Sequence, residues 1–481
     1  MKRKQLLTLL ALCSLYSHAG GAAPTPSAAK IKDVLQTCID TQHRAPAIVV
    51  GVIDKNGVTV VGWGKRADGS SEEVNGDTVF EIGSMTKVFT GLLLQDMADH
   101  SEVKLDDPIT NYLPASVKVP SRNGREITLR SLATHTSGLP RLPDNLDSKD
   151  DENPYADYTV DQLYQFLSHY KLPRNIGAKS EYSNLGMGLL GHILALKAGM
   201  NYEALAVNRI CNPLKMDSTR ITLTPELKAR LAVPHNEAGV ATKNWDLPTL
   251  PGCGALRSTV NDILKLLAAE MGIAPSAQTG EMRKTQAPQK PSGFLSEIGL
   301  AWQIDKDDGT IWHNGGTGGY CSYMGFKQDK SLGVVVLANG ANDVDDIGQY
   351  LLGDAVKLET PAIRHAVKID YSVYDRYAGN YNCSWADALF VITRQGDHLM
   401  AKLADQPAER GIQTYILVFG RRRLALPRCL VDPFFADHLR DRANLGSLCP
   451  LHPLLFPRSQ CTSTDRSRPG AVARSRQSRL H

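Results

Sequence analysis

The stretch "AIVVGVIDKNGVTVVGWGK", residues 47–65, holds two β-rich runs on either side of Asn56-Gly57. An Asn-Gly pair between runs of Val and Ile is a strong signal for a β-hairpin with a tight turn. We therefore predict that a sheet begins with this hairpin.

Further strands are expected only much later in the chain. From Ser84 to about Leu256 the apolar spacing is mostly helical, with Pro- and Gly-rich breaks such as "THTSGLPRLPDN". Strand character then returns in "GLAWQID", "TIWHN", "GGYCSYMGFKQ" and "LGVVVLANG", and the helical "DVDDIGQYLLGDAVKL" follows. This order predicts an α/β (α+β) fold, in which helices flank an antiparallel sheet and the long insertion forms a helical lobe across a cleft.

The first residues are typical of a secretory signal peptide. Basic residues at positions 2–4 precede an apolar run from Leu6 to Tyr16, and small residues continue to Ala22. The run is shorter than the roughly 20 apolar residues of a membrane helix, and no later stretch approaches that length. We expect residues 1–22 to be removed and the mature protein to be secreted, in the periplasm, with no transmembrane segment.

The C-terminal part differs from the rest. We expect one domain over residues 23–360 and a partial small β-domain over 361–408, with a hairpin in "ALFVITRQGDHLMAKLADQ". Residues 409–481 form an anomalous Arg-rich tail: from Gly420 onward there are 12 Arg and four Asp, but neither Lys nor Glu. Folding gives no reason for this bias, so we expect out-of-frame translation. A disordered basic tail is the alternative.

Charge and cysteine spacing exclude several classes of protein. The net charge is +4, and the residues from Gly420 onward carry 12 − 4 = +8, so the first 419 residues carry 4 − 8 = −4. A body of this charge gives no basis for nucleic-acid binding. No cysteine pair has metal-ligand spacing, and we expect neither a metal nor a cofactor. Free buried thiols and one or two disulfides remain the options, and among possible disulfides we favour Cys211 with Cys253.

"EIGSMTKVFTGLLLQDM", residues 81–97, contains a candidate nucleophile. Ser-x-x-Lys also occurs elsewhere, for example at Ser27 and at Ser168, but Ser84 is followed by an apolar run that predicts an amphipathic helix. Residues three apart share a helix face, so Ser84 and Lys87 can touch. The N–H groups at a helix start can also stabilise an oxyanion. The alternative is that Ser84 only caps the helix and that Lys87 is solvated.

Two later stretches add candidate groups. Tyr182-Ser183-Asn184 is the only Tyr-x-Asn in the chain and leads into an apolar run. A tyrosine and a lysine beside a serine can pass its proton to a leaving group. His313 precedes glycines at 315, 316, 318 and 319. These glycines allow close backbone approach, so a substrate could lie along this strand with the Gly316 N–H as an oxyanion donor.

Together these motifs resemble the serine β-lactamase and penicillin-binding-protein superfamily, in particular its class C β-lactamase, DD-peptidase and family VIII esterase branch. Ser-x-x-Lys, Tyr-x-Asn and a Lys/His-x-Gly strand occur in that family's order, and the resemblance covers about residues 45–357. Supporting stretches are "LATHTSGLP" (132–140), "PLKMDSTR" (213–220) and "GALRSTVNDILKLL" (254–267).

The resemblance implies roles for these residues. Ser84 would be acylated, Lys87 and Tyr182 would share the base and acid work, and Asn184 would contact the amide side of the substrate. The N–H groups of Ser84 and Gly316 would bind the oxyanion, with Gly315 and His313 on the substrate-binding strand. A base must be neutral, so the pKa of Lys87 should be lowered.

His313 stands where many β-lactamases have Lys. Since an unperturbed histidine has a pKa of about 6.5, it gives no fixed cation at neutral pH. We therefore predict that His313→Lys lowers KM for a substrate that carries a carboxylate.

The resemblance implies a serine hydrolase whose substrate is a small β-lactam, an ester or a cell-wall peptide. β-Lactam hydrolysis is the leading expectation. A DD-carboxypeptidase or D-aminopeptidase and a family VIII-type carboxylesterase are alternatives with the same residues. An inactive penicillin-binding or scaffold protein is the non-enzymatic alternative. The oligomeric state stays open.

Overall fold

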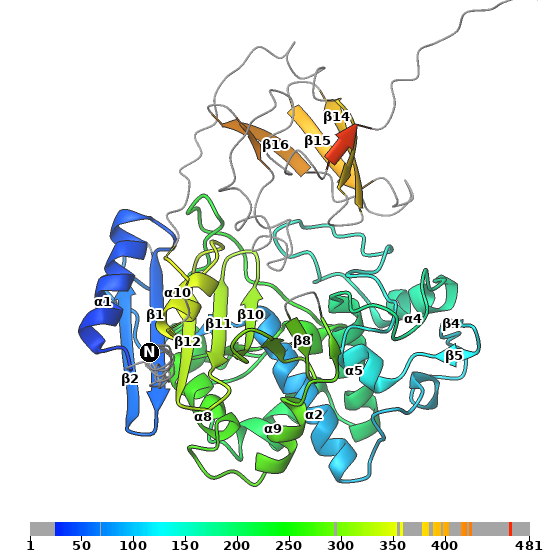
Figure 1. The fold of residues 1–481 in the computed structure, drawn as a ribbon, viewed down its shortest axis with the longest axis horizontal. Coiled ribbons are helices and arrows are strands. Elements are labelled where there is room, and N and C mark those ends of the chain that lie inside the picture. The colour runs from blue at the N-terminus through cyan, green and yellow to red at the C-terminus, as the bar shows by residue number, and fades with distance from the viewer. Residues whose placement is uncertain are drawn as a thin grey trace, which may run out of the picture. The chain divides into compact units, whose positions relative to one another are not determined.

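A computed structural model describes residues 25–67, 69–292, 296–353 and 356–358, together with strands further on (Figure 1). The chain divides into two compact units, Met1–Pro361 and Ala362–His481. The expected signal peptide, residues 1–22, lies outside the described residues.

The N-terminal hairpin forms as predicted. Its strands are β1 (Ala47–Asp54) and β2 (Gly57–Gly64), which pair so that Asp54 faces Gly57. The Asp54 carboxylate accepts hydrogen bonds from the backbone N–H of Asn56 at 2.7 Å and of Gly57 at 3.2 Å. This side chain therefore stabilises the turn that the Asn-Gly pair predicts.

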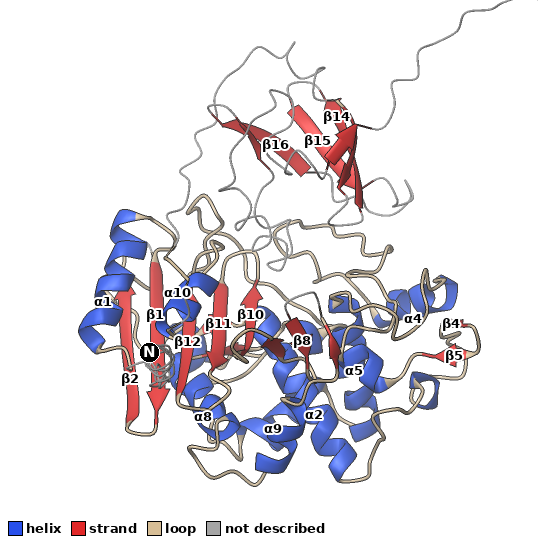
Figure 2. Ribbon diagram, viewed as in Figure 1, coloured by secondary structure: helices blue, strands red, loops and turns tan. Residues whose placement is uncertain are grey.

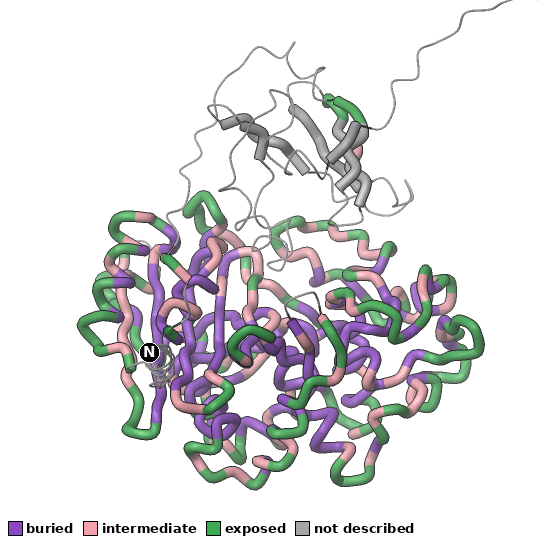
Figure 3. Tube along the Cα trace, in the orientation of Figure 1, coloured by how far each residue is buried: buried purple, intermediate pink, exposed green. Residues whose placement is uncertain are grey.

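The hairpin belongs to an eight-stranded antiparallel sheet with the order β2-β1-β12-β11-β10-β9-β8-β7. The later strands are β7 (Lys290–Pro291), β8 (Ser296–Ile298), β9 (Gln303–Asp305), β10 (Ile311–Gly316), β11 (Cys321–Phe326) and β12 (Leu332–Ala338). Every residue of β1 and β12 is buried (Figure 3). These two strands pair with each other, so the sheet joins a strand from the start of the unit to one near its end. The predicted mixed fold with an antiparallel sheet is confirmed.

Helices cover both faces of this sheet (Figure 2). A side chain at Gly51 would meet Val260 and Leu264 of α8 (Val260–Glu270), whereas Tyr323 packs against Gly348 of α10 (Asp345–Leu351). The register places Gly51 opposite Val335 and Val335 opposite Met324, the neighbour of Tyr323. Because successive side chains alternate between faces, α8 and α10 lie on opposite faces. At the edge, α1 (Ala28–Gln36) packs against β2.

The regular secondary structure between β2 and β7 is mainly helical, as predicted. The α-helices of this segment are α2 (Thr86–Asp99), α3 (Leu129–Ala133), α4 (Val160–His169), α5 (Asn184–Ala198), α6 (Tyr202–Ala206), α7 (Pro225–Ala229), α8 and α9 (Thr279–Thr285). Two small sheets pair β3 (Phe80–Glu81) with β6 (Arg257–Ser258) and β4 (Ser121–Arg122) with β5 (Arg125–Glu126).

The sequence prediction of an amphipathic α2 is wrong. Every residue from Thr86 to Met97 is buried, and the helix packs against α5 and α9. A helix that is enclosed on all sides belongs to the centre of a core rather than to its surface. Polar groups on α2 are therefore held inside the protein.

The expected disulfide is also wrong. Cys211 and Cys253 are free and buried, as is Cys38, while Cys321 is free and partly buried. Cys211 and Cys253 belong to the apolar core, where burial raises the pKa of both thiols. They serve as small apolar core residues.

The described strands of the second unit form a six-stranded sheet with the order β17-β16-β15-β14-β13-β18. They are β13 (Gly379–Cys383), β14 (Ala388–Gln395), β15 (His398–Leu403), β16 (Tyr415–Gly420), β17 (Arg423–Ala425) and β18 (Cys461–Ser463). β14 and β15 form the predicted hairpin. The other residues of 409–481 lie outside the described residues, so out-of-frame translation stays a prediction.

Within the described ranges, no helix has the length and apolar character that crossing a membrane requires.

Candidate active site

Ser84 lies in a 3-10 turn, Gly83–Met85, that connects β3 to α2. It is the one residue between 78 and 97 that is not buried. Its side chain caps neither the turn nor the helix. The Ser84 Oγ instead accepts hydrogen bonds from the Lys87 Nζ at 2.8 Å and from the Tyr182 hydroxyl at 2.7 Å. The capping alternative is therefore wrong, and three predicted site residues meet at one oxygen.

The Lys87 side chain is fully buried, so it is not the solvated side chain of the alternative interpretation. Its Nζ donates to the Ser84 Oγ at 2.8 Å, to the Asn184 Oδ1 at 2.9 Å and to the carbonyl oxygen of Cys253 at 2.7 Å. Among these three partners only the serine hydroxyl can also donate. A neutral Lys87 that keeps its bonds to the two carbonyl oxygens would therefore turn its lone pair toward Ser84. The predicted lowering of its pKa stays a prediction.

Tyr182 and Asn184 are positioned by the start of α5. The Ser183 hydroxyl between them accepts from the Gly186 N–H at 2.8 Å and donates to the Pro140 carbonyl at 2.6 Å. The Asn184 Nδ2 donates to the Tyr155 hydroxyl at 3.0 Å, which leaves its Oδ1 facing Lys87. An N-cap therefore fixes both side chains of the Tyr-x-Asn motif.

The glycines of β10 bring its backbone against the turn that holds Ser84. A Cβ atom at Gly315 would lie 2.1 Å from the Ile82 carbonyl oxygen and 3.0 Å from the Ser84 nitrogen. Gly83 has φ +48°, and a Cβ there would lie 2.7 Å from the Gly316 nitrogen. Side chains at these positions would separate the two segments, so both glycines are needed for the backbone approach. The backbone nitrogens of Ser84 and Gly316 thus lie in adjoining segments.

His313 shares a sheet face with Gly315, since they are two residues apart on one strand. Asn314 points to the other face, where its Nδ2 donates to Asp345 of α10 at 2.7 Å. His313 is 1% exposed. Burial and, next, the charge of Lys87 lower its pKa to about 3. His313 is therefore uncharged at neutral pH. Its Nε2 has no hydrogen-bond partner among the described residues.

Sequence reasoning missed four further residues around the site. The His135 ring lies 4.7 Å from the Tyr182 ring, and its Nδ1 accepts from the Ser183 N–H at 3.2 Å. Burial, with the charge of Lys87 next, holds the pKa of His135 well below its usual value. The other three missed groups are Tyr155, the carbonyl of Cys253 and Arg141. "LATHTSGLP" signalled His135 only through resemblance, and nothing in the sequence marks Tyr155 or the carbonyl of residue 253.

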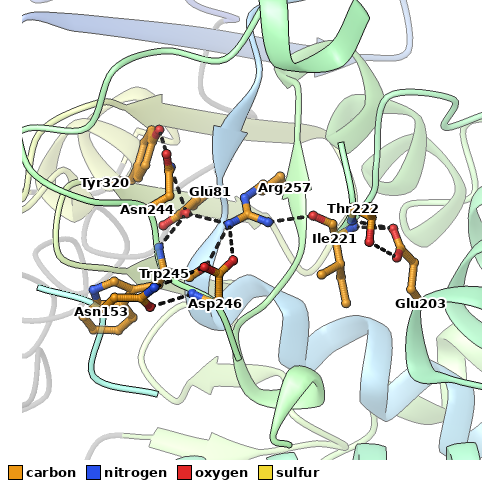
Figure 4. A network of polar contacts seen from close by, with 10 residues as sticks. All are labelled: Glu81, Asn153, Glu203, Ile221, Thr222, Asn244, Trp245, Asp246, Arg257 and Tyr320. Atoms are coloured by element: carbon orange, nitrogen blue, oxygen red, sulfur yellow. Dashed lines mark hydrogen bonds and ion pairs between the residues drawn. The ribbon is translucent and has the colours of Figure 1, made fainter. Parts of the chain in front are cut away.

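A buried ion pair supports the strand that precedes Ser84 (Figure 4). Arg257 of β6 lies 3.2 Å from Glu81 of β3, and it also donates to the carbonyl of Trp245 at 2.8 Å. Glu81 accepts from the Trp245 N–H and the Asn244 amide, both at 3.0 Å. Burial raises the pKa of Glu81, and Arg257 opposes this rise. The pair joins the β3–β6 sheet to the loop around Trp245.

Within the part of the chain that the structure describes, no group of three or more His, Cys, Asp or Glu side chains is placed to hold a metal ion. The arrangement around Ser84 consists of a hydroxyl, an amine, a phenol and backbone N–H groups. These are the components of nucleophilic acyl transfer.

Comparison with known proteins agrees with this arrangement. The family model described as Beta-lactamase matches residues 28–356. The D-alanyl-D-alanine-carboxypeptidase/endopeptidase AmpH of Escherichia coli (strain K12) is 31% identical over 356 residues, which cover 70% of this chain and 91% of AmpH. A β-lactamase of the same organism is 26% identical over 373 residues, which cover 69% of this chain and 94% of that protein.

A solved structure shows the same similarity. The crystal structure of a β-lactamase/D-alanine carboxypeptidase from Yersinia pestis has a TM-score of 0.60 and 28% sequence identity, and covers 68% of this chain and 98% of that one. The chain therefore belongs to the β-lactamase family and is a β-lactamase-like serine hydrolase.

Proposed function

We propose that this hydrolase forms an acyl-enzyme on Ser84 and that its leading reaction is hydrolysis of the β-lactam amide. The observation that carries the proposal is the meeting of Lys87 and Tyr182 at the Ser84 Oγ, at 2.8 Å and 2.7 Å. Ser84 is also the one partly exposed residue of an otherwise buried segment, residues 78–97, so a substrate can reach it. The proposed catalytic residues are Ser84, Lys87 and Tyr182.

In the proposed acylation, the Ser84 oxygen attacks the substrate carbonyl and its proton passes to the neutral Lys87 amine. The Tyr182 hydroxyl gives its proton to the leaving nitrogen as the C–N bond breaks, and it regains a proton from Lys87. Water then attacks the ester on Ser84 and releases the acid. This division of roles is supported by the two carbonyl acceptors that would turn the lone pair of a neutral Lys87 toward Ser84.

Substrate binding is proposed to use both sides of Ser84. Asn184 would contact the amide on the acyl side of the scissile bond. On the other side, β10 would hold the substrate along Gly315 and Gly316, with His313 beside it. The backbone N–H groups of Ser84 and Gly316 would bind the oxyanion. The close approach of Gly83 and Gly315 to the facing backbone supports this pairing.

D-alanyl-D-alanine carboxypeptidase activity is the second candidate. It is favoured by the 31% identity to AmpH, whose name states that activity. Both reactions acylate a serine and differ in how quickly water releases the acyl group. A carboxylesterase uses the same groups, and a penicillin-binding protein without turnover is the remaining alternative.

We also propose that residues 23–360 form the catalytic domain and that the protein is exported to the periplasm. Export is supported by the basic, apolar and small residues of positions 1–22. Mass spectrometry of the N-terminus of the protein purified from the periplasmic fraction tests it. A chain that starts near residue 23 is expected, and an intact Met1 would contradict the proposal.

The proposed activity is tested by giving nitrocefin, a D-Ala-D-Ala peptide and a p-nitrophenyl short-chain ester to the wild type and to Ser84→Ala. We expect turnover of nitrocefin by the wild type, with all activity lost in the variant. Faster peptide cleavage would favour the carboxypeptidase. Both proteins would also be incubated with a fluorescent penicillin. If neither the wild type nor Ser84→Ala became labelled, the protein would be non-enzymatic.

A further inference from the structure

We infer that Arg141 selects substrates with a carboxylate on the acyl side of the scissile bond. The inference rests on the proposed function and goes beyond it, since it names a specificity-determining residue and a substrate class.

The backbone around Arg141 is fixed to the Tyr-x-Asn motif. The Arg141 carbonyl accepts from the Leu185 N–H at 3.0 Å, and the preceding Pro140 carbonyl accepts from the Ser183 hydroxyl at 2.6 Å. The guanidinium carbon lies 5.1 Å from the centre of the Tyr182 ring, and the residue is exposed. An exposed cation is therefore held next to the proposed acid.

Arg141 lies on the side of the site where Asn184 lies, because its carbonyl accepts from the N–H of Leu185, the residue after Asn184. Its charge contributes to the lowered pKa of His135, and it opposes the raised pKa values of Tyr155 and Cys253. Tyr155 binds the Asn184 amide directly. Since Asn184 is proposed to contact the acyl-side amide, a group on the adjoining carbon of the substrate would come toward Arg141.

The other basic groups of the site are less suited to an anion on this side. Lys87 is fully buried, and burial lowers the pKa of His313 to about 3, so that His313 carries no charge at neutral pH. Arginine keeps its charge at all physiological pH values, and its planar fork of N–H donors matches a carboxylate.

Three penicillins provide a matched test, since they share the leaving side and differ at one acyl-side carbon. Carbenicillin carries a carboxylate there, benzylpenicillin a hydrogen and ampicillin an ammonium group. Their second-order acylation rates are measured by competition with a fluorescent penicillin. Each rate is divided by the rate for benzylpenicillin. The wild type is expected to have a higher relative rate with carbenicillin than with ampicillin.

Arg141→Met is expected to reduce the carbenicillin-to-ampicillin rate ratio about threefold to tenfold, as for loss of an exposed charge-assisted contact. Arg141→Lys should keep part of the preference, because it keeps the charge. Arg125→Met, on the exposed β5 strand, makes the same change in net charge and should leave the ratio unchanged.

Two results would overturn the inference while leaving the proposed function in place. One is an unchanged ratio in Arg141→Met. The other is an equal loss of rate for all three penicillins, which would show that Arg141 acts only through Tyr182. No acylation of the wild type by any of them would overturn both proposals.

Discussion

The two sides of Ser84 are built differently. On the helical side, Lys87, Tyr182 and Asn184 form a continuous set of hydrogen bonds between side chains. On the strand side, β10 approaches through the glycines at 315 and 316, and its one ionisable group, His313, is uncharged. If the proposed roles are right, proton transfer would depend on a few polar side chains, whereas oxyanion binding would depend on two backbone segments that glycine allows to approach.

The largest effects are expected on the helical side. Lys87→Met and Tyr182→Phe should each lower kcat/KM for nitrocefin by about 10²- to 10⁴-fold, the usual contribution of a general acid or base. The double variant should lose little more than the worse single variant, because the two residues act as a unit.

Steady-state kinetics measure kcat/KM of the single and double variants, and circular dichroism checks that each variant is folded. Asn208→Ala, an exposed substitution on the π-helical turn Val207–Cys211, is a control that should keep full activity. If the fold loss of kcat/KM in the double variant equalled the product of the two single losses, Lys87 and Tyr182 would act independently.

The strand side is tested by Gly315→Ala. Its methyl group would push β10 away from Ile82 and Ser84, so we expect kcat to fall by about 10²- to 10³-fold, as when an oxyanion donor is lost. Gly280→Ala is the matched control, because a Cβ at Gly280 would meet nothing within 4 Å. Measuring kcat together with the thermal stability of each variant separates a loss of catalysis from a loss of folding. Full activity in Gly315→Ala would show that close approach of β10 is not needed.

His313→Lys tests whether a positive charge on the strand side would improve binding of a substrate carboxylate. We expect KM for a β-lactam carboxylate to fall about threefold, in line with a partly screened ion pair, and KM for a neutral ester to stay the same. Because the pKa of His313 is about 3, His313→Asn should not change the pH profile of kcat/KM between pH 5 and 8. An unchanged or higher KM in His313→Lys would count against this role for position 313.

The last prediction concerns stability rather than activity, and tests whether burial neutralises a carboxyl group away from the site as it neutralises His313. Burial raises the pKa of Glu270 to about 8. Between about pH 4.5 and 8 the folded chain therefore keeps a proton that the unfolded chain loses. This costs up to about 1.4 kcal/mol of stability for each unit that pH rises.

Glu270→Gln should remove this dependence, as measured by urea unfolding at pH 5, 6.5 and 8. The exposed Glu126→Gln should keep it. A wild-type stability that does not fall relative to Glu270→Gln as pH rises would show that Glu270 is ionised in the folded protein.

The sequence predicts those parts of the fold and site that depend on local pattern. The turn at Asn56-Gly57 and the contact between Ser84 and Lys87 follow from hairpin chemistry and helix spacing. The burial of α2 on every side could not be predicted, because it depends on α5 and α9 packing around it.

The missed site residues have the same cause. Cys253 binds Lys87 through a carbonyl that every residue possesses, and Tyr155 lies in a loop without a motif. The choice of Cys211 and Cys253 as a disulfide failed because spacing along the chain carries no information on which thiols meet. Contacts made by backbone groups or by loops far apart in sequence leave no local pattern.

Acylation of Ser84 can be observed by mass spectrometry of a trapped intermediate. The wild type would be mixed with a slowly released penicillin, quenched in acid and digested. If Ser84 is the nucleophile, the peptide that contains Ser84 gains one penicillin mass, and the same peptide of Ser84→Ala gains none. A label on another residue, or one that persists in Ser84→Ala, would contradict it.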